Sequence, residues 1–284
     1  MENLRVSIVT PSFNQGEFIE ETILSVSGQT YPHIEHLIVD GGSTDHTLDV
    51  LRTYEGAYNM RWISEPDEGQ SDALNKGFEM ASGDVIGWIN SDDVYFSPDA
   101  VSTVARAFVQ NPGADVVCGD LARINERGQL MNIYPYNSYV IERHFPQPST
   151  FFRKHIVEKH RLDTSLKFCM DRDFFIRLKR DYRFHHVCKV LACLRMHTAT
   201  KFYYLGAEGY LKERALIDQR YGLRRDARFW TARAVFWFLR LRGYLLKLRL
   251  AHESSPYHFP FITTHDNLAS QIAADLRSAL GINA

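Results

Sequence analysis

Two adjacent carboxylates stand where a hydrophobic run ends. Residues 85–89 are apolar and are typical of a buried strand, and Asn90, Asp92 and Asp93 follow them closely. Two like charges side by side repel, and burial would shift their pKa values unless a positive group neutralised them. Hard oxygen ligands suit Mg²⁺ or Mn²⁺, which keep open positions for phosphate oxygens. The pair therefore predicts a divalent-cation site, with a cap on the helix expected after Ser97 as the alternative.

A second acidic cluster begins a predicted amphipathic helix at residues 170–182. Asp171 and Asp173 stand on either side of Arg172, and Arg177 lies about one and a half turns further on. A carboxylate in such a place can take the proton of a reacting hydroxyl as a general base. The alternative is that the acids complement the dipole at the helix start, with Arg177 on a solvated face.

Two further positions carry polar groups directly after apolar runs. Asp40 follows residues 34–39, and the two glycines after it let the backbone approach a ligand. Its carboxylate could accept hydrogen bonds from a base or a ribose, or the segment could be a turn that caps a helix at Ser43 or Thr44. His197 follows a later strand-like run and could ligate a metal, although a lone histidine is more often structural.

The first third of the chain alternates strand-like and amphipathic segments. Periodicity predicts strands at 5–13, 34–42, 60–66 and 83–93, and helices at 17–30, 43–54 and 69–82. This alternation predicts an α/β fold with a mostly parallel sheet and helices on both faces. Ligands in such sheets lie outside the carboxyl ends of the strands. We therefore expect one crevice toward which four side chains point: Thr10, Asp40, Glu65 and Asp92.

The rest of the chain predicts a helix and a strand between residues 97 and 120, a hairpin around Gly128, and a strand at 184–196. Beyond residue 203 the sequence becomes rich in arginine and aromatic residues and predicts further helices, with a polar linker at 252–260 and a last helix at 265–280. We therefore predict a first domain at 1–204 and a helical C-terminal region at 205–284.

Composition narrows the function classes. The net charge of −1 argues against a protein that binds nucleic acid along its whole length. The four cysteines are dispersed without metal or disulfide spacing, which indicates buried thiols in a reducing compartment. The first residues do not form a signal-peptide pattern, and charges interrupt the most apolar late segment, 234–250. We expect a cytoplasmic protein, either soluble or peripheral on the inner face of the membrane.

Two long segments resemble a known family. "VSIVTPSFNQGEFIEETILSVSGQTYPHIEHLIVDGGSTDHT" (6–47) and "EPDEGQSDALNKGFEMASGDVIGWINSDD" (65–93) are similar to the nucleotide-binding half of the family-2 inverting glycosyltransferases. The resemblance covers residues 4–200 and implies their GT-A fold, a Rossmann-like, mostly parallel sheet flanked by helices. The dinucleotide and P-loop glycine motifs are both missing from the sequence, in keeping with this resemblance.

The resemblance also implies roles for individual residues around the donor. Asp40 would bind the nucleobase, which Thr10 and Pro11 would also hold, and Asp92 would bind the metal and the donor diphosphate. Asn90 stands where the family usually has an acid, so a neutral side chain would hold the ribose or a water there. Leu74 replaces a frequent arginine, and the nearby Asp72 could take over its nucleobase contact.

On the acceptor side, the resemblance makes Asp171 the general base, with Asp173 in a supporting or acceptor-side role. His197 matches the histidine of an R-x-H segment and would be a second metal ligand, next to residues that could contact the diphosphate. Residues 144–152 would shape the wall of the acceptor site.

We therefore expect an inverting glycosyltransferase that depends on Mn²⁺ or Mg²⁺ and moves a sugar from a nucleotide sugar, most simply a UDP-sugar, to a saccharide or lipid-linked acceptor.

Basic and aromatic residues interleaved at 228–249 predict an interfacial helix on an anionic membrane. Packing of that helix on the first domain or on a second subunit, giving a homo-oligomer, is an equal alternative. The alternative function is a catalytically silent, nucleotide-sugar-binding scaffold. A sugar-phosphate nucleotidyltransferase would need a basic, glycine-rich loop after the first strand, and "TPSFNQGEF" is not one.

Overall fold

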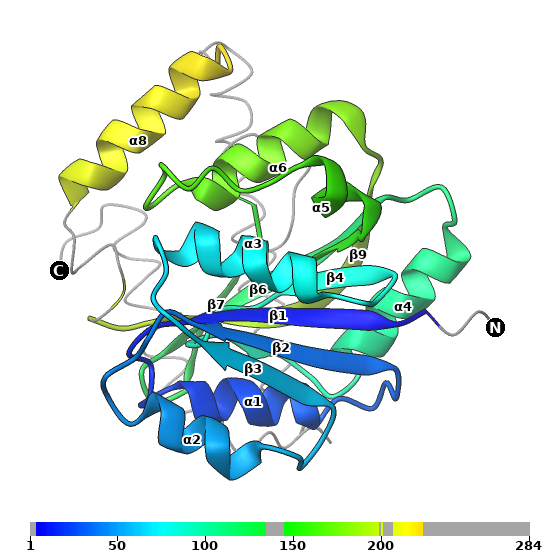
Figure 1. Cartoon of the computed structure of the whole chain (residues 1–284). Coiled ribbons are helices and arrows are strands. Elements are labelled where there is room, and N and C mark those ends of the chain that lie inside the picture. The colour runs from blue at the N-terminus through cyan, green and yellow to red at the C-terminus, as the bar shows by residue number, and fades with distance from the viewer. Residues whose placement is uncertain (1–3, 135–144, 199, 201–206, 224–284) are drawn as a thin grey trace, which may run out of the picture.

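A computed structural model describes residues 4–134, 145–198, 200 and 207–223. The first half of this part alternates strands and helices as the sequence predicts, and its helices start at the side where the strands end (Figure 1). Its elements are β1 (Val6–Ser12), α1 (Ile19–Ser27), β2 (Ile34–Asp40), α2 (Thr47–Tyr54), β3 (Met60–Ser64), α3 (Gln70–Met80) and β4 (Val85–Trp88).

The second half contributes more strands to the same sheet, together with the helices that cover its far end. Its described elements are β5 (Val94–Tyr95), α4 (Ala100–Gln110), β6 (Val116–Asn125), β7 (Leu130–Tyr134), a 3₁₀ turn η1 (Gln147–Ser149), β8 (Thr150–Arg153), α5 (His155–Lys159), α6 (Met170–Asp181), β9 (Phe184–Met196) and α8 (Ala207–Arg220).

The described strands form one sheet in the order β3-β2-β1-β4-β8-β6-β9-β5, with β7 paired to β6. β1 to β4 run parallel, as does the long pairing of β6 with β9, whereas β8 runs antiparallel to both of its neighbours. The predicted parallel core is therefore confirmed, and β8 joins the two parallel parts.

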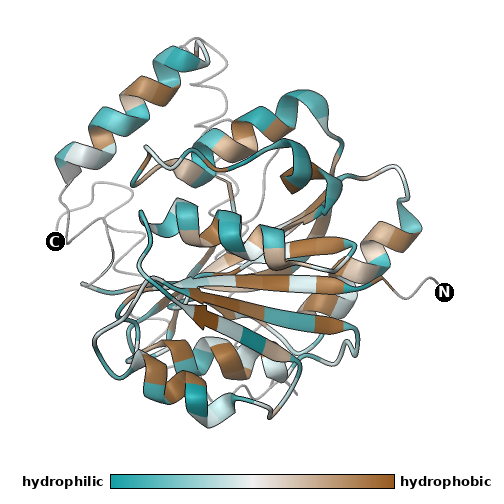
Figure 2. Ribbon diagram, viewed as in Figure 1, coloured by the Kyte–Doolittle hydropathy of each residue, from teal (hydrophilic) through white to brown (hydrophobic). Residues whose placement is uncertain are grey.

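Helices cover both faces of the sheet, as predicted, and the apolar strands lie between them (Figures 1 and 2). Successive side chains of a strand point to opposite faces. Accordingly, Ile8 belongs to a buried cluster with Val101 and Val104 of α4, whereas Val9 belongs to one with Leu74 and Phe78 of α3. α3 approaches β1 closely because it carries Gly77, where a Cβ would lie 2.4 Å from the Val9 side chain.

Several local predictions need correction. α2 begins at Thr47 rather than at Ser43 or Thr44, because Ser43 is bonded to Asp40 and Asp45 receives the N–H of Thr47. The sequence also missed β5, a strand of two residues that pairs with β9. Of the four free cysteines, three are buried as expected, but Cys188 is exposed.

The C-terminal region is described only as far as residue 223. α8 packs on the first domain through Ile217, which is fully buried in the same cluster as Phe174 of α6. In the part of the chain that the structure describes, no helix has the length and apolar character needed to cross a bilayer. The predicted interfacial helix at 228–249 and the segments at 252–280 lie outside the described residues, and the boundary at residue 204 stays a prediction.

Candidate active site

The loop that follows β4 separates its two carboxylates. Asp93 is fully buried, and its Oδ1 accepts the backbone N–H of Arg195 at 2.9 Å while its Oδ2 accepts the Asn90 amide at 3.1 Å. The Asp92 side chain remains 20 % exposed. Burial, followed by the charge of Asp92, raises the pKa of Asp93 well above its usual range, and the two hydrogen bonds oppose that rise. Neither acid caps a helix, since α4 begins at Ala100.

A buried arginine on β9 is the positive partner of this loop. The Arg195 side chain is inaccessible to solvent, and its Nε donates to the carbonyl oxygen of Asp92 at 2.9 Å. Its Nη1 donates to the carbonyl oxygen of Glu126 at 2.9 Å, and its Nη2 pairs with Glu21 of α1 at 2.5 Å. One cation thereby joins the acidic loop to α1 and to the hairpin between β6 and β7. The sequence does not predict that Arg195 holds this loop. Its R-x-H spacing does place Arg195 and His197 on one face of an extended chain.

His197 and Asp92, the two predicted metal ligands, lie together. His197 Nε2 is 2.9 Å from Asp92 Oδ2, and the imidazole packs against the Phe18 ring with 4.4 Å between centroids. Its Nδ1 is buried and has no hydrogen-bond partner among the described residues. Arg195 contacts the backbone of Asp92 and His197 contacts its carboxylate, so both residues at the end of β9 hold the loop after β4.

These two side chains fit a cation that retains waters and phosphate oxygens, because such an ion uses only one or two protein ligands. Within the described ranges, no group of three or more His, Cys, Asp or Glu side chains is placed to hold a metal by itself. Metal ligation by Asp92 and His197 stays a prediction.

The neutral residue of the loop, Asn90, has a structural reason to be neutral. Its Oδ1 accepts hydrogen bonds from Trp88 Nε1 at 2.9 Å and Gln70 Nε2 at 2.8 Å. Its Nδ2 donates to Asp93 at 3.1 Å and to Gln147 at 3.2 Å. A carboxylate could not make those two donations and would face the buried Asp93. Contact of Asn90 with a ribose stays a prediction, and it would have to replace or share one of these bonds.

At the nucleobase end, the side chains of the predicted residues are buried. Thr10 and Pro11 lie inside β1, which continues to Ser12, and the Thr10 hydroxyl is 2.9 Å from Nε2 of His36. Burial lowers the pKa of His36 to about 3, so this partner is neutral at ordinary pH. The Thr10 hydroxyl is therefore already used by a buried imidazole, and contact of Thr10 or Pro11 with a nucleobase stays a prediction.

Asp40 is fully buried, and its carboxylate accepts four hydrogen bonds from protein groups. The donors are the backbone N–H groups of Gly42 and Ser43 and the hydroxyls of Ser43 and Ser64. These bonds shape the loop after β2. A nucleobase contact from Asp40 stays a prediction that requires one of them to be given up or shared.

The first turn of α3 explains two other positions. Leu74 is fully buried in the cluster beneath α3, so it packs in the core. Asp72 accepts the backbone N–H of Glu68 at 3.2 Å and pairs with Lys76 at 3.3 Å. Lys76 also pairs with Glu65, the fourth side chain expected in the crevice, which is exposed. A nucleobase contact by Asp72 is untested.

The acidic pair at the start of α6 also divides into a buried and an accessible member. Asp173 is 2 % exposed at its side chain and accepts hydrogen bonds from Arg177, Arg220 and Tyr221, so it ties α6 to α8. Asp171 is half-buried, and its Oδ1 accepts the backbone N–H of Arg172 at 2.7 Å. Asp173 therefore joins α6 to the end of α8, and the role of Asp171 as general base stays a prediction.

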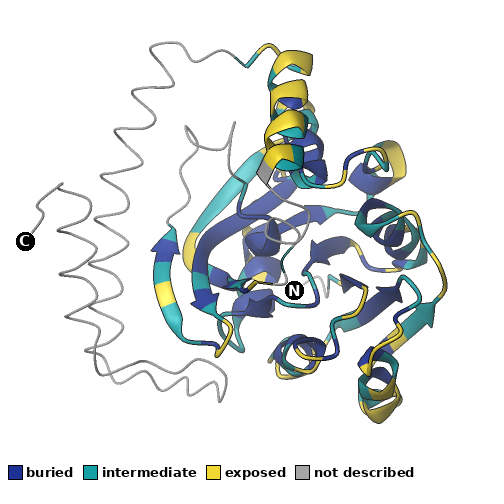
Figure 3. Cartoon of the chain, turned by 90° about the vertical axis from the view of Figure 1, so that its left-hand side faces the viewer, coloured by how far each residue is buried: buried dark blue, intermediate teal, exposed yellow. Residues whose placement is uncertain are grey.

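Contacts across the first turn of α3 place the start of α6 on the crevice side of the sheet. Lys167 Nζ donates to the carbonyl oxygen of Glu68 at 2.6 Å, and Gln70 reaches Asn90 at the end of β4. Figure 3, viewed from the left-hand side of Figure 1, shows that the strands are mostly buried and the helices around them carry the exposed residues. Strand ends, the first turn of α3 and the segment that leads to Asp171 therefore share one side of the molecule.

One aromatic residue of this region was missed from the sequence. Phe13 directly follows β1 and is 57 % exposed, which is unusual for a large apolar side chain. The next residue, Asn14, has a φ of 51°, and its Oδ1 accepts the N–H of Thr44 at 2.9 Å. Asn14 thus fixes the loop and leaves the Phe13 ring open at the carboxyl end of β1.

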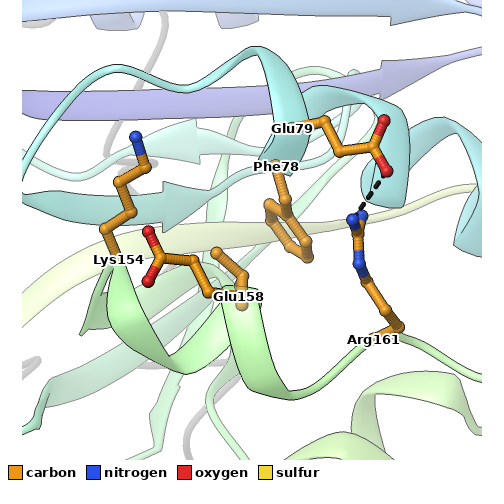
Figure 4. A pocket seen from close by; sticks show the side chains of 6 residues that line it. Phe78, Glu79, Lys154, Glu158 and Arg161 are labelled. Carbon is orange, nitrogen blue, oxygen red and sulfur yellow. Dashed lines mark hydrogen bonds and ion pairs between the residues drawn. The ribbon is translucent and has the colours of Figure 1, made fainter.

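A hollow of about 280 Å³ lies elsewhere, between α3 and α5 (Figure 4). It is lined by Phe78, Glu79, Lys154, Val157, Glu158 and Arg161, and Glu79 pairs with Arg161 across it at 2.6 Å. None of the predicted site residues is among those that line it, and its charges of both signs are already close to one another. It gives no reason to place the chemistry there.

Comparison with known proteins agrees with this geometry. Residues 7–179 match the family model described as glycosyl transferase family 2. An uncharacterized glycosyltransferase of Mycobacterium tuberculosis is 30 % identical over 178 residues, which are 61 % of this chain and 68 % of the relative.

Two solved structures are similar in fold. S. aureus TarS 1–349 in complex with UDP-GlcNAc has a TM-score of 0.56 and 21 % identity, with 88 % of this chain and 78 % of that one covered. The mannosyltransferase PcManGT from Pyrobaculum calidifontis, in complex with GDP-Man and Mn²⁺, has a TM-score of 0.61 and 18 % identity, with 98 % and 81 % covered. This chain spans only 39 % of the longer TarS chain. The predicted GT-A fold is confirmed.

Proposed function

The chain belongs to glycosyl transferase family 2, and from this premise we propose that it transfers a sugar, with inversion at the anomeric carbon, from a nucleotide sugar to a hydroxyl of a saccharide or lipid-linked acceptor. The observation that carries the proposal is the pairing of Asp92 with His197 at 2.9 Å, at the strand end where donors bind in α/β sheets. The similar TarS and PcManGT structures, which hold UDP-GlcNAc and GDP-Man, support a nucleotide-sugar donor. A UDP-sugar is the form that we propose.

The donor would lie along the carboxyl ends of β1, β2 and β4. Phe13 offers an exposed ring face for a base, because stacking on an aromatic side chain is favourable and tolerant of base identity. The loop shaped by Asp40 would flank the base, and the Asn90–Asp93 loop would lie nearest to the diphosphate. Asp72 and the backbone of Thr10 and Pro11 would complete this side.

The transfer needs one base and no covalent nucleophile. Asp171 would take the proton of the acceptor hydroxyl while that oxygen forms a bond to the anomeric carbon. The bond from the anomeric carbon to the diphosphate oxygen breaks in the same step, and its electron pair leaves with the nucleoside diphosphate. Attack from the face opposite to the leaving group gives inversion.

Asp92 and His197 would hold Mn²⁺ or Mg²⁺, which when bound neutralises the charge that develops on the departing diphosphate. The role of the protein itself is to keep Asp92 in place, through Arg195 at the backbone and His197 at the side chain. The Mn²⁺ in the PcManGT structure supports this part of the proposal.

The scaffold alternative rested on two departures from the family pattern, and both have structural reasons. Asn90 donates to the buried Asp93, which an acid at this position could not do, and Leu74 packs in the core under α3. These contacts support the enzyme over the scaffold as our proposal. Acceptor identity, cytoplasmic location, membrane contact through residues 228–249 and homo-oligomer formation belong to the proposal and await their own tests.

A donor screen tests the proposed function. The protein is incubated with UDP-, GDP- and dTDP-sugars, with Mn²⁺, Mg²⁺ or EDTA, and nucleoside diphosphate release and donor binding are measured. We expect release with one class of donor that falls when EDTA is present. Neither binding nor release with any donor would contradict the proposal, whereas binding without release in the presence of a broad acceptor panel would favour the scaffold. Liposome flotation, compared between the full chain and one ending at Leu223, tests membrane contact.

A further inference from the structure

The segment that leads into α6 is held from outside by α8, a helix that lies beyond the residues matched by the family model. Glu213 on α8 accepts three consecutive backbone N–H groups: Oε1 takes that of Lys167 at 2.7 Å, and Oε2 takes those of Phe168 at 2.8 Å and Cys169 at 3.0 Å. Asp171 stands two residues after the last of these donors. The carboxylate therefore binds the backbone directly before the proposed base.

This contact places a carboxylate directly beside the start of α6. The first N–H groups of a helix have no partners within the helix, and a side chain of the N-cap residue usually takes one of them. Cys169 occupies the N-cap position of α6 and makes no side-chain capping bond in the described part of the chain. An anionic group is favourable at this end of a helix because of the helix dipole. Glu213 supplies such a charge from another helix and takes the N–H of the N-cap residue itself, whereas the N–H of Arg172 in the first turn goes to Asp171.

Three more hydrogen bonds, two from α8 and one from Tyr221 directly after it, hold the residues that follow Asp171. Asp218 accepts a hydrogen bond from Nη2 of Arg172 at 2.5 Å, and Asp173 accepts bonds from Arg220 at 2.9 Å and Tyr221 at 2.7 Å. The polar contacts of α8 thus lie on both sides of Asp171 in the sequence. They hold the first turn of α6 through the side chains of Arg172 and Asp173.

A glycine of α8 allows this helix to approach the segment before α6 closely. Gly209 lies inside the helix, where glycine is about 1 kcal/mol less favourable than alanine. A Cβ at this position would come within 2.6 Å of the Phe168 ring. The glycine therefore lets the segment before α6 lie against α8, and Figure 1 shows the two helices at the same end of the molecule. Ile217, fully buried, anchors the other end of α8 in the core.

We propose that α8 is a positioning element for the reaction, in which Glu213 sets the place of the Asp171 carboxylate through the backbone of residues 167–169. The inference rests on the proposed function, because it assigns a consequence to the position of the base. A carboxylate that accepts a proton in the transfer step must be placed to well within 1 Å, and a misplacement of about 1 Å can lower the rate about 100-fold. The same three bonds could otherwise serve stability alone, and the test separates the two roles.

The test compares Glu213→Gln with Glu208→Gln in the full chain. Glutamine keeps the shape of glutamate but has a single acceptor oxygen, so it cannot receive all three N–H groups. Glu208 lies on the same helix, is 81 % exposed at its side chain and pairs only with Lys212 in the bonds described for it, so it is the matched control. With the best donor from the screen, we expect Glu213→Gln to lower kcat about 10- to 100-fold with the donor KM within twofold of the parent value, and Glu208→Gln to change neither.

A stabilising role alone would lower the melting temperature and the yield of Glu213→Gln but leave kcat per donor-binding molecule at the parent value. That result, with kcat normalised to the binding stoichiometry, would overturn the inference. If Glu213→Gln failed to fold, Asp218→Asn would test the same claim at Arg172. A lower kcat with an unchanged donor KM would support the inference, and a kcat at the parent value would overturn it. An unaltered enzyme that turned over no donor would overturn the proposed function and this inference together, whereas parent kcat in both variants would overturn the inference alone.

Discussion

At the end of β4, Asp93 is buried and Asp92 is half-buried; at the start of α6, Asp173 is buried and Asp171 is half-buried. Both regions therefore use two acids, with one member fixed in the interior and the other left accessible. The partners of the buried member differ. Asp93 receives an N–H of the backbone and an amide, whereas Asp173 receives two guanidinium groups and a phenol.

The two regions also differ in exposure. Arg195, which holds the loop after β4, has a fully buried side chain, whereas Arg220, which holds Asp173, is 38 % exposed. Charges near the surface are screened by water and salt, and buried charges are screened much less. The proposed donor side is therefore fixed by the core of the sheet. The proposed base is held instead by a peripheral helix, and solvent can weaken the contacts of that helix.

The largest expected effect comes from the accessible acid at the start of α6. Asp171→Asn should lower kcat by about 10²- to 10⁴-fold, because the amide cannot accept the proton, while the Kd of the donor stays within a few-fold. Asp181→Asn, on an exposed residue at the far end of the same helix, is the control. Steady-state kinetics and donor titration measure both quantities, and parent turnover in Asp171→Asn would mean that the base lies elsewhere.

Removal of the buried arginine tests the interior half of the comparison. Arg195→Met should lower the free energy of unfolding by about 3–5 kcal/mol, because Glu21 loses its buried partner and three carbonyl groups lose a donor. Urea unfolding measures the change. Arg52→Met is the control, since its exposed pair with Asp49 should contribute under about 1 kcal/mol. Equal effects of the two substitutions would remove the distinction between interior and surface.

Restoration of the usual family acid should be harmful in this chain. Asn90→Asp loses the donations to Asp93 and Gln147 and should lower the free energy of unfolding by about 1–3 kcal/mol. The pKa of the new carboxyl should be raised in the folded state by the neighbouring Asp93. Stability is then lost as pH rises from the unfolded pKa of about 4 toward the folded one, so the penalty should be larger at pH 8 than at pH 5.

Urea unfolding at the two pH values measures this penalty, with Asn59→Asp as the control, because the Asn59 amide is exposed and donates only to a carbonyl in its described bonds. A stability that did not change at either pH would show that the network around Asn90 does not depend on its neutral side chain.

The smallest effect is expected at the surface. Arg220→Gln should lower the free energy of unfolding by about 0.5–1 kcal/mol at low salt, since Asp173 retains Arg177 and Tyr221 as donors. In 1 M NaCl, where screening reduces the contribution of Arg220, the difference from the parent protein should nearly vanish. The Arg195→Met penalty should persist in the same salt. A salt-independent loss in Arg220→Gln would place this contact with the interior ones.

Much of the fold follows from sequence periodicity. The apolar runs that end at Asp40 and Asn90 are strands of the parallel core, and the residues predicted for α3 and α6 are helical within a few positions. Local patterns carry this information because each strand or helix face is set by residues close in sequence. β5 escaped prediction because two residues are too few for a period to emerge.

The site was less accessible to prediction, because its contacts join distant residues. The pairing of Asp92 with His197 was expected from the family pattern, but the contacts of Arg195 with Asp92, Glu126 and Glu21 have no local signal. The burial of Thr10 depends on His36 in the next strand, and the support of α6 depends on Glu213 in a helix beyond the family match. Such partners become visible only once the strands and helices are placed in space.

The bond between Asp93 and the N–H of Arg195 spans 102 positions of the chain, and this separation bears on synthesis at the ribosome. A nascent chain carries both acids of the loop long before β9 has emerged, so Asp93 must stay hydrated until that strand arrives. Contacts between residues far apart in sequence form late, because closing a long loop costs entropy first. During translation the first parallel strands would therefore form early, and the loop after β4 would be completed among the last parts of the fold. Until β9 has been synthesised, the unfinished sheet has an exposed edge strand that must be shielded from other chains.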